Sequence, residues 1–165
     1  MTKIINVATA AIFNTEEGIR RGMCLYSLRL DDKPRPGMWE WPGGKLDYHM
    51  VGGESETPWE AAARECMEEL GVTVIPLLHP ADSFIGTATI DLVTHIVVLH
   101  VVAARLANPA AKPTPIQSQG LRWANPQYAV DSMGCSPGTY PMHRLVIEFM
   151  KRHRVECRHE GWEPL

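Results

Sequence analysis

The chain has 165 residues, a formal net charge of −3 at pH 7, and 45% hydrophobic and 21% charged residues. This length suits one domain with a proper core, and we expect that domain to span residues 1–165. The two signs of charge are mixed and no run approaches the roughly 20 apolar residues that cross a bilayer, so neither a nucleic-acid polymer nor a membrane is expected as a partner.

Four cysteines stand at irregular positions, which fit neither a disulfide framework nor paired zinc knuckles. Two of them, Cys24 and Cys66, fall in apolar patterns and are expected to be buried thiols. Free thiols are typical of a reducing compartment, so we expect a cytoplasmic protein. A zinc site built from His153, Cys157 and His159 is disfavoured, because a second cysteine pair is missing.

The first elements in chain order are strands. Residues 4–13 are rich in β-branched side chains and predict a buried strand, and residues 14–18 predict a hairpin-type turn. Residues 23–30 alternate in polarity and are expected to pair back as a second strand. Residues 31–37 predict a loop by their proline and glycine content, and a short strand at residues 39–41 leads into Pro-Gly-Gly.

Residues 58–70 are predicted to form a helix. Thr57 is a good N-cap, Pro58 suits the first helical position because its missing N–H is not needed there, and Gly71 suits the position after the end. At 3.6 residues per turn, one face carries an apolar stripe that is formed by Trp59, Ala63, Cys66 and Leu70.

A second face of this helix is acidic. Glu65, Glu68 and Glu69 lie at i, i+3 and i+4, so their carboxylates are close neighbours. Like charges at that spacing repel one another unless a cation is near, and a hard divalent ion such as Mg²⁺ prefers oxygen ligands. The alternative is an ordinary solvated face, which is the usual place for acidic residues.

The remaining elements give a mixed pattern of strands and helix. The strand pattern recurs at residues 84–90, 94–104 and 121–124. The first two of these strands are expected to form a long hairpin. Residues 108–118 are rich in proline and are expected to form a mobile surface loop. A helical turn is expected within residues 125–130, and residues 142–152 are amphipathic and predict a second helix.

Residues 39–72, WEWPGGKLDYHMVGGESETPWEAAARECMEELGV, resemble the box of the Nudix hydrolase family, G-x5-E-x7-R-E-U-x-E-E-x-G-U with U aliphatic. From Glu56 onward the spacing matches at every fixed position, with Cys66 as a small apolar stand-in for the aliphatic residue. The resemblance implies an α/β fold, the Nudix α/β/α sandwich with a mixed β-sheet. Before Glu56 the chain departs from the pattern, because Gly44 precedes it by 12 positions instead of six. We interpret the difference as a loop insertion within residues 48–53.

The resemblance also implies the chemistry, which is hydrolysis of a nucleoside diphosphate linked to another group. The cofactor would be Mg²⁺ or Mn²⁺, and the partner a small nucleotide substrate. The expected metal ligands are the backbone carbonyl of Gly43 and the carboxylates of Glu65, Glu68 and Glu69. One group must assist deprotonation of the attacking water, and Glu65 and a downstream residue both remain open. Arg64 is expected to pair with Glu56 rather than to touch the substrate.

The approach to the box is similar to one branch of the family, the MutT-like nucleoside triphosphate pyrophosphohydrolases. Trp41 matches an aromatic residue of that branch and is expected either to pack on a purine ring or to lie in the core. Arg29 and Lys45 match phosphate contacts, and a solvated strand-end charge is the alternative for each. The branch carries a base-reading Asn before its last helix. This chain offers none there, and Tyr140 or Asp131 would have to substitute.

We therefore expect an enzyme that hydrolyses a nucleoside triphosphate, such as the oxidised purine nucleotide 8-oxo-dGTP, to a monophosphate and pyrophosphate. The alternatives are a nucleotide-sugar or ADP-ribose pyrophosphatase and a non-catalytic nucleotide-binding module. Such modules usually lose box glutamates, and all of them are present here. No carboxylate directly precedes Trp123, where the family often supplies a further metal ligand. A homodimer is one oligomeric state that the sequence leaves open.

Overall fold

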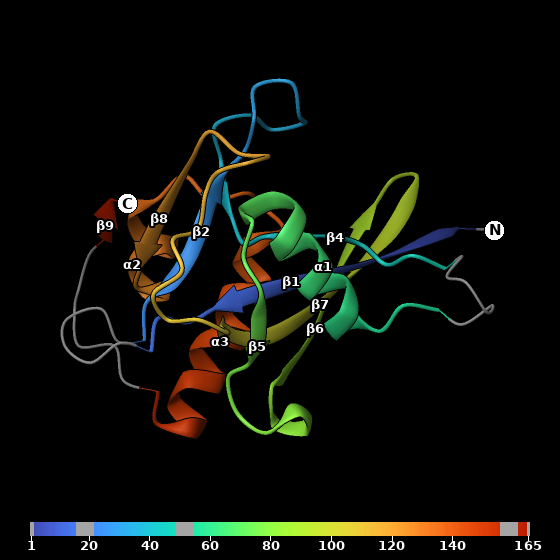
Figure 1. Ribbon diagram of the computed structural model, residues 1–165. Coiled ribbons are helices and arrows are strands. Elements are labelled where there is room, and N and C mark those ends of the chain that lie inside the picture. The colour runs from blue at the N-terminus through green and yellow to red at the C-terminus, as the bar shows by residue number, and fades with distance from the viewer. Residues whose placement is uncertain (1, 16–21, 49–54, 156–161, 165) are drawn as a thin grey trace.

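The computed structural model of the chain describes residues 2–15, 22–48, 55–155 and 162–164 (Figure 1). The strands are β1 (Lys3–Ile12), β2 (Cys24–Leu28), β3 (Trp39–Glu40), β4 (Gly43–Lys45), β5 (Val74–Pro76), β6 (Phe84–Leu92), β7 (His95–Leu106), β8 (Gly120–Ala124) and β9 (Trp162–Pro164). The helices are α1 (Pro58–Leu70), the 3₁₀ turn η1 (Pro80–Asp82), α2 (Pro126–Ser132) and α3 (Thr139–His153). Within the described ranges, no helix is long and apolar enough to cross a membrane.

The larger sheet is built around β1. On one side β1 pairs antiparallel with β4, and on the other it pairs in parallel with β7, from Lys3 opposite His95 to Ile12 opposite Ala104. β7 pairs in turn with β6 and, nearer its C-terminal end, with β5, both antiparallel. Parallel strands need a long crossover connection, and the segment that contains α1 lies between β1 and β7 in the sequence. The predicted mixed sheet is therefore confirmed.

A smaller sheet runs in the order β3-β2-β8-β9. β2 lies at its centre, antiparallel to both β3 and β8. Phe13, directly after β1, bridges to Cys24 at the start of β2 and so joins the two sheets. This sheet matters for function because β3 leads directly into the Pro-Gly-Gly segment.

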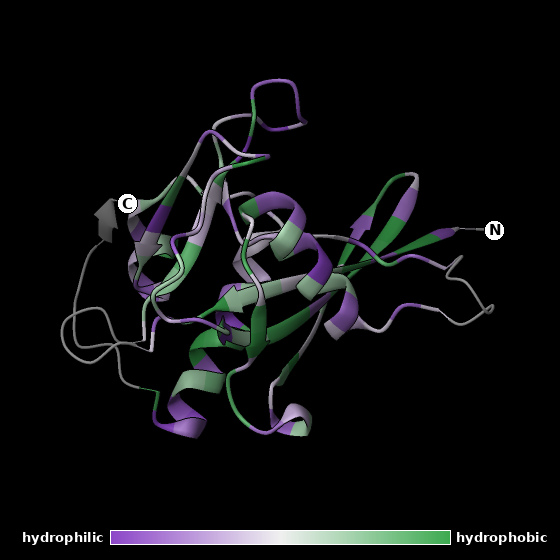
Figure 2. Cartoon of the chain, in the orientation of Figure 1, coloured by the Kyte–Doolittle hydropathy of each residue, from purple (hydrophilic) through white to green (hydrophobic). Residues whose placement is uncertain are grey.

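Helices cover both faces of the larger sheet. Successive residues of a strand point to opposite faces, so Ala8, Ala10 and Ile12 of β1 pack with α1, whereas Ala11 and Phe13 pack with α3. Figure 1 shows α1 across the front of β1 and β7, and Figure 2 shows hydrophobic residues along these central strands. The three layers confirm the predicted α/β/α sandwich.

The helix α1 has the predicted bounds, and its ends explain why. The Thr57 hydroxyl accepts a hydrogen bond from the Glu60 amide, and the Glu60 carboxylate accepts one from the Thr57 amide, which forms a capping box. Gly71 ends the helix with a φ of 66°, a left-handed conformation that glycine adopts without steric cost. The predicted buried thiols of Cys24 and Cys66 are confirmed, since both residues are fully buried.

Two elements differ from the sequence prediction. The second long helix begins at Thr139 rather than at residue 142, because Pro141 falls within the first turn, where its missing N–H leaves no helical hydrogen bond unmade. The strand β4 was not predicted, because Gly43 and Gly44 have low strand propensity and only pairing with β1 makes them a strand.

The proline-rich segment at residues 108–118 is anchored rather than free. The Thr114 amide donates to the Leu70 carbonyl at 2.9 Å, and the Ile116 amide donates to the Glu69 carbonyl at 2.9 Å. These bonds satisfy carbonyl groups that the end of α1 would otherwise leave without partners. The predicted mobile loop is therefore corrected to a segment held against the C-terminal end of α1.

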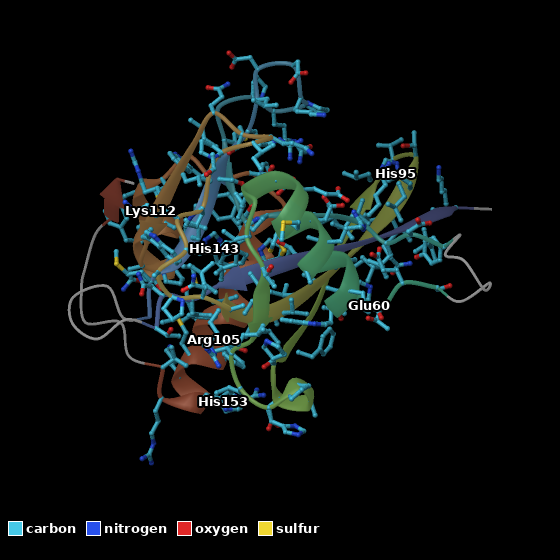
Figure 3. The ribbon with its side chains drawn as sticks, in the orientation of Figure 1. Glu60, His95, Arg105, Lys112, His143 and His153 are labelled. Atoms are coloured by element: carbon cyan, nitrogen blue, oxygen red, sulfur yellow. The ribbon has the colours of Figure 1, made fainter. Side chains whose placement is uncertain are left out.

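One histidine lies entirely inside the fold. His143 of α3 is fully buried, and Figure 3 shows it in the interior. Its Nδ1 can only donate to the Thr139 carbonyl, 2.8 Å away, so its Nε2 accepts from the Tyr26 hydroxyl at 2.8 Å. Its ring centroid also lies 4.6 Å from that of Trp41. Burial lowers the pKa of His143 to about 4, so the ring is neutral at pH 7.

The neutral His143 should make the fold acid-sensitive. Its pKa is about 4 in the folded chain against a usual value of about 6.5, so between these pH values the unfolded chain binds the additional proton. The free energy of unfolding should therefore fall as the pH is lowered from about 6.5 to 4, on the order of 3 kcal/mol in total. The measurement is urea unfolding at stepped pH values.

The matched variant is His143→Gln, which keeps a neutral donor and acceptor but does not titrate. We expect the difference in unfolding free energy between the wild type and this variant to change across that pH window. A constant difference would show that His143 does not carry the acid sensitivity.

Candidate active site

The acidic face of α1 lies against the short strand β4. The Gly43 amide donates to the Glu69 carboxylate at 3.2 Å, and a Cβ placed on Gly44 would overlap the carboxylate of Glu65. The Glu65 side chain is 15% exposed, whereas that of Glu68 is 47% exposed. Two of the three predicted carboxylates are therefore held beside β4, and the third lies at the surface.

Both glycines of β4 are required by close approaches on two sides. A Cβ on Gly43 would overlap the backbone of Ala8 and Thr9 in β1, the strand with which β4 pairs. A Cβ on Gly44 would occupy the space of the Glu65 carboxylate. The Gly-Gly pair thus brings the strand, the helix and its carboxylates closer together than any larger residue would allow.

Arg64 pairs with Glu56, as predicted. Its Nε and Nη2 donate to the two oxygens of the Glu56 carboxylate at 2.9 and 3.0 Å, a bidentate contact. Its Nη1 also donates to Glu65 at 2.8 Å, and its Nη2 to the Lys45 carbonyl at 3.0 Å. Hydrogen bonding to Arg64 lowers the pKa of Glu56, and the same contact raises the pKa of Arg64. Both groups of this nearly buried pair are therefore charged.

Glu56 also closes the loop that precedes the helix. Its amide donates to the Asp47 carbonyl, and its carboxylate accepts from the Asp47 amide, both at 2.9 Å. The predicted insertion at residues 48–53 begins directly after this contact. Tyr48 is exposed and bonds to Asn6, and residues 49–53 lie outside the described residues. The two bonds hold β4 and α1 together at both ends of the longer interval.

Negative charge is concentrated beside β4. The pKa of Glu69 is raised to about 8, first by burial and then by the negative charge of Glu65, against the opposing effect of the Gly43 amide. A divalent cation bound among these groups would relieve that repulsion. The donor set contains only oxygen atoms, which suits a hard cation, and the space that Gly44 leaves over β4 holds one of the carboxylates.

The carboxylates do not yet converge on one point. Among the described residues, no three His, Cys, Asp or Glu side chains are grouped so that they could hold a metal ion as they stand. Glu65 faces Arg64, and Glu69 faces the Gly43 amide. The donor types therefore fit a divalent cation, and binding one requires these two side chains to turn away from their present donors.

A pocket of about 220 Å³ opens next to Gly43. Its charged side is formed by Arg29, Arg35 and Glu40. Its apolar side is formed by Val7, Ile90, Leu92, Val97, Leu99 and Met142. Between them lie Thr9, Trp41, Ser136, Gly138 and Thr139. Because Gly43 lines this pocket and also contacts Glu69, the pocket is continuous with the acidic face of α1.

The residues predicted to bind substrate are divided between this pocket and the surface. Trp41 is 3% exposed and packs against His143, yet it lines the pocket, so it is both a core residue and part of the pocket wall. Arg29 lines the pocket as well. Lys45 and Tyr140 are exposed and are not part of the lining. Roles for these two in substrate binding stay predictions.

Two charged residues of the pocket were missed from the sequence, Arg35 and Glu40. Glu40 lies on β3 and pairs with Arg29. Burial raises the pKa of Glu40, and the nearby Arg29 partly offsets this. Arg35 lies in the loop between β2 and β3. Local pattern carries no signal for either, because it does not show which loop and strand-end residues face a cavity formed by distant segments.

A profile of the NUDIX domain matches residues 4–138, well over half of the chain. The chain belongs to the Nudix family. The predicted enzyme class, a Nudix pyrophosphohydrolase, is confirmed. Enzymes of this family act on small nucleotide substrates and generally use divalent metal ions.

Solved structures similar to this Nudix chain have the same fold. The MutT protein from Methanosarcina mazei Go1 matches with a TM-score of 0.69 at 19% identity, over 93% of this chain and 97% of that one. The E. coli ORF135 protein matches with a TM-score of 0.66 at 23% identity, over 93% and 94%. A C. elegans Ap4A hydrolase matches with a TM-score of 0.66 at 19% identity, over 90% and 98%. No match is found among curated proteins.

Gly44→Ala tests whether this Nudix site needs Glu65 in its position over β4. The added Cβ meets the flexible end of the Glu65 side chain rather than backbone, so we expect the fold to persist while the carboxylate is displaced. Displacing a catalytic group by about 1 Å can cost about 100-fold in rate, and we expect at least that loss of turnover.

Gly120→Ala is the matched control, because a Cβ there meets nothing within 4 Å. Turnover and thermal midpoint would be measured for both variants. Wild-type turnover by Gly44→Ala would show that catalysis does not depend on where Glu65 lies.

Proposed function

We propose that this Nudix enzyme hydrolyses a nucleoside triphosphate to a monophosphate and pyrophosphate, with Mg²⁺ or Mn²⁺ as its metal. The observation that carries the proposal is the continuity between the acidic face of α1 and the pocket, through Gly43. A nucleotide has a charged phosphate chain and a flat, largely apolar base. The pocket has a charged side and an apolar side, so one substrate molecule can match both.

The acidic face supplies the catalytic groups in this proposal. The residues that would hold the metal are Glu65, Glu68, Glu69 and, through its carbonyl, Gly43. When bound, the metal neutralises charge on the phosphates and lowers the pKa of a bound water. Arg64 and Glu56 are positioning residues, because their bidentate contact fixes the helix against β4 and the same guanidinium orients Glu65.

The apolar side of the pocket would bind the base. Ile90, Val97 and Met142 offer flat apolar contacts, and the buried Trp41 forms part of the adjoining wall. Thr139, at the start of α3, brings a hydroxyl group to the same wall. It stands one residue before Tyr140 and is the polar side chain available where the MutT-like branch has its Asn. An oxidised purine triphosphate such as 8-oxo-dGTP is therefore one candidate among several bases.

The alternative substrates are diphosphate-linked nucleotides. The likeness to the Ap4A hydrolase keeps dinucleoside polyphosphates under consideration beside ADP-ribose and nucleotide sugars. A non-catalytic nucleotide-binding module is disfavoured, because the box glutamates are all present and two of them lie beside β4.

The deciding experiment is a hydrolysis panel with Mg²⁺ or Mn²⁺. It contains the common and oxidised nucleoside triphosphates, Ap4A, ADP-ribose and several nucleotide sugars, and it distinguishes released phosphate from pyrophosphate. Preferred turnover of one triphosphate with release of pyrophosphate supports the proposal and identifies the base. Preferred turnover of a diphosphate-linked compound overturns the choice of substrate.

Glu69→Gln should abolish most of the metal-dependent turnover. The amide keeps the size of the side chain but removes the negative charge, so we expect a loss of at least about 100-fold with little change in thermal midpoint. Glu148→Gln on α3 is the matched control, since Glu148 is 59% exposed and pairs only with Arg144 at 3.9 Å among the described residues. Equal turnover of the two variants would remove Glu69 from the mechanism.

A further inference from the structure

The two arginines that line the pocket differ in their partners. Arg29 donates through Nη1 to both oxygens of Glu40, at 2.7 and 2.5 Å, and through Nε to the Pro34 carbonyl at 2.9 Å. Its charge is therefore balanced by Glu40. The Arg35 side chain makes no hydrogen bond or ion pair with any other residue that the structure describes. Arg35 is thus the pocket cation whose donors are all available to a ligand.

The backbone holds Arg35 in an uncommon conformation. Its φ of 61° lies in the left-handed region, which residues other than glycine rarely adopt because the Cβ crowds the backbone. Pro34 and Pro36 restrict the backbone on either side, and the Arg29 side chain binds the carbonyl directly before Arg35. The Arg29 amide also donates to the Met38 carbonyl at 3.0 Å. Such strain persists only where the surrounding structure imposes it, and it often marks a functional residue.

The acidic surroundings call for a positive group on this side of the pocket. Glu40 is close enough to Glu69 for their charges to repel, and Glu65 adds to the same field. A phosphate chain brings further negative charge. Arg35 lies in the exposed, hydrophilic loop between β2 and β3, which projects at the top of Figure 2. It can therefore meet a phosphate chain at the open side of the pocket.

We propose that Arg35 binds the phosphate chain of the substrate and that Arg29 positions it. A planar guanidinium donates two parallel hydrogen bonds to two phosphate oxygens, and these charge-assisted bonds are strong. Arg29, fixed between Glu40 and the Pro34 carbonyl, holds the loop segment from which Arg35 reaches the pocket. This inference rests on the proposed function and moves the phosphate contact that the sequence assigned to Arg29 one loop further along the chain.

The test compares Arg35→Ala with Lys33→Ala. Both remove one positive charge from the same exposed loop, but Lys33 does not line the pocket. On the best triphosphate of the wild type, we expect Arg35→Ala to raise KM about 10-fold to 100-fold with kcat nearly unchanged. Lys33→Ala should stay within about two-fold of the wild type, and Arg35→Lys should lie between. Equal KM values for Arg35→Ala and Lys33→Ala overturn the proposal.

Arg35→Gly separates binding from structure. Glycine relieves the left-handed strain, so the thermal midpoint should be unchanged or higher, while KM should rise as much as in Arg35→Ala. A purely structural role predicts the opposite, a more stable variant with normal KM. A rise in KM with no loss of stability therefore supports direct phosphate binding.

A failure of the substrate proposal can be told apart from a failure of this one. If the wild type prefers a diphosphate-linked compound, the same variants are compared on that compound. If it hydrolyses nothing, they are compared by equilibrium binding of a triphosphate with a methylene bridge between the α- and β-phosphorus atoms. Loss of affinity in Arg35→Ala but not in Lys33→Ala supports the role of Arg35 in either case. Equal affinities, or no binding by the wild type, overturn it.

Discussion

The geometry of the acidic face depends on the ion pair between Glu56 and Arg64. A carboxylate buried as deeply as that of Glu56 is costly without a partner, and the bidentate contact makes its position between β4 and α1 tolerable. The same guanidinium reaches Glu65 and the Lys45 carbonyl. Removing one partner of a buried pair costs about 3–5 kcal/mol, and less here because Arg64 is 34% exposed. One side chain thus links the helix, the loop and the strand.

Sterics and charge then act in opposite directions on the same groups. Gly43 and Gly44 allow β4 to lie close to both β1 and the carboxylates, which crowds negative charge into a small volume. Arg64 offsets this charge at Glu56 and Glu65, and Arg29 offsets it at Glu40. No described cation pairs with Glu69, whose pKa is raised. The fold therefore leaves one carboxylate whose charge is stabilised only if a cation enters from outside, which agrees with the metal dependence that is general in this family.

Local signals in the sequence predicted what local physics determines. The ends of α1 and its acidic face follow from capping residues and from a 3.6-residue period, both of which lie within 15 residues of sequence. The strand β4, the anchored proline-rich segment and the pocket residues Arg35 and Glu40 depend on pairing between distant segments, such as Ile116 with Glu69. Residue counting placed Arg29 in the pocket correctly, but it could not show that Glu40 already balances its charge.

The contact between Asp47 and Glu56 explains how the loop before α1 can differ from the family pattern while the helix does not. Two hydrogen bonds join the ends of the interval, so its length does not set where the helix begins. Doubling a flexible loop costs only about 0.6 kcal/mol in closure entropy. The spacing from Glu56 onward has no such freedom, because Arg64 must reach Glu56 and Glu69 must reach Gly43 from fixed turns of one helix. Insertions are therefore tolerated before Glu56, and a shift of one residue after it would turn the carboxylates away from β4.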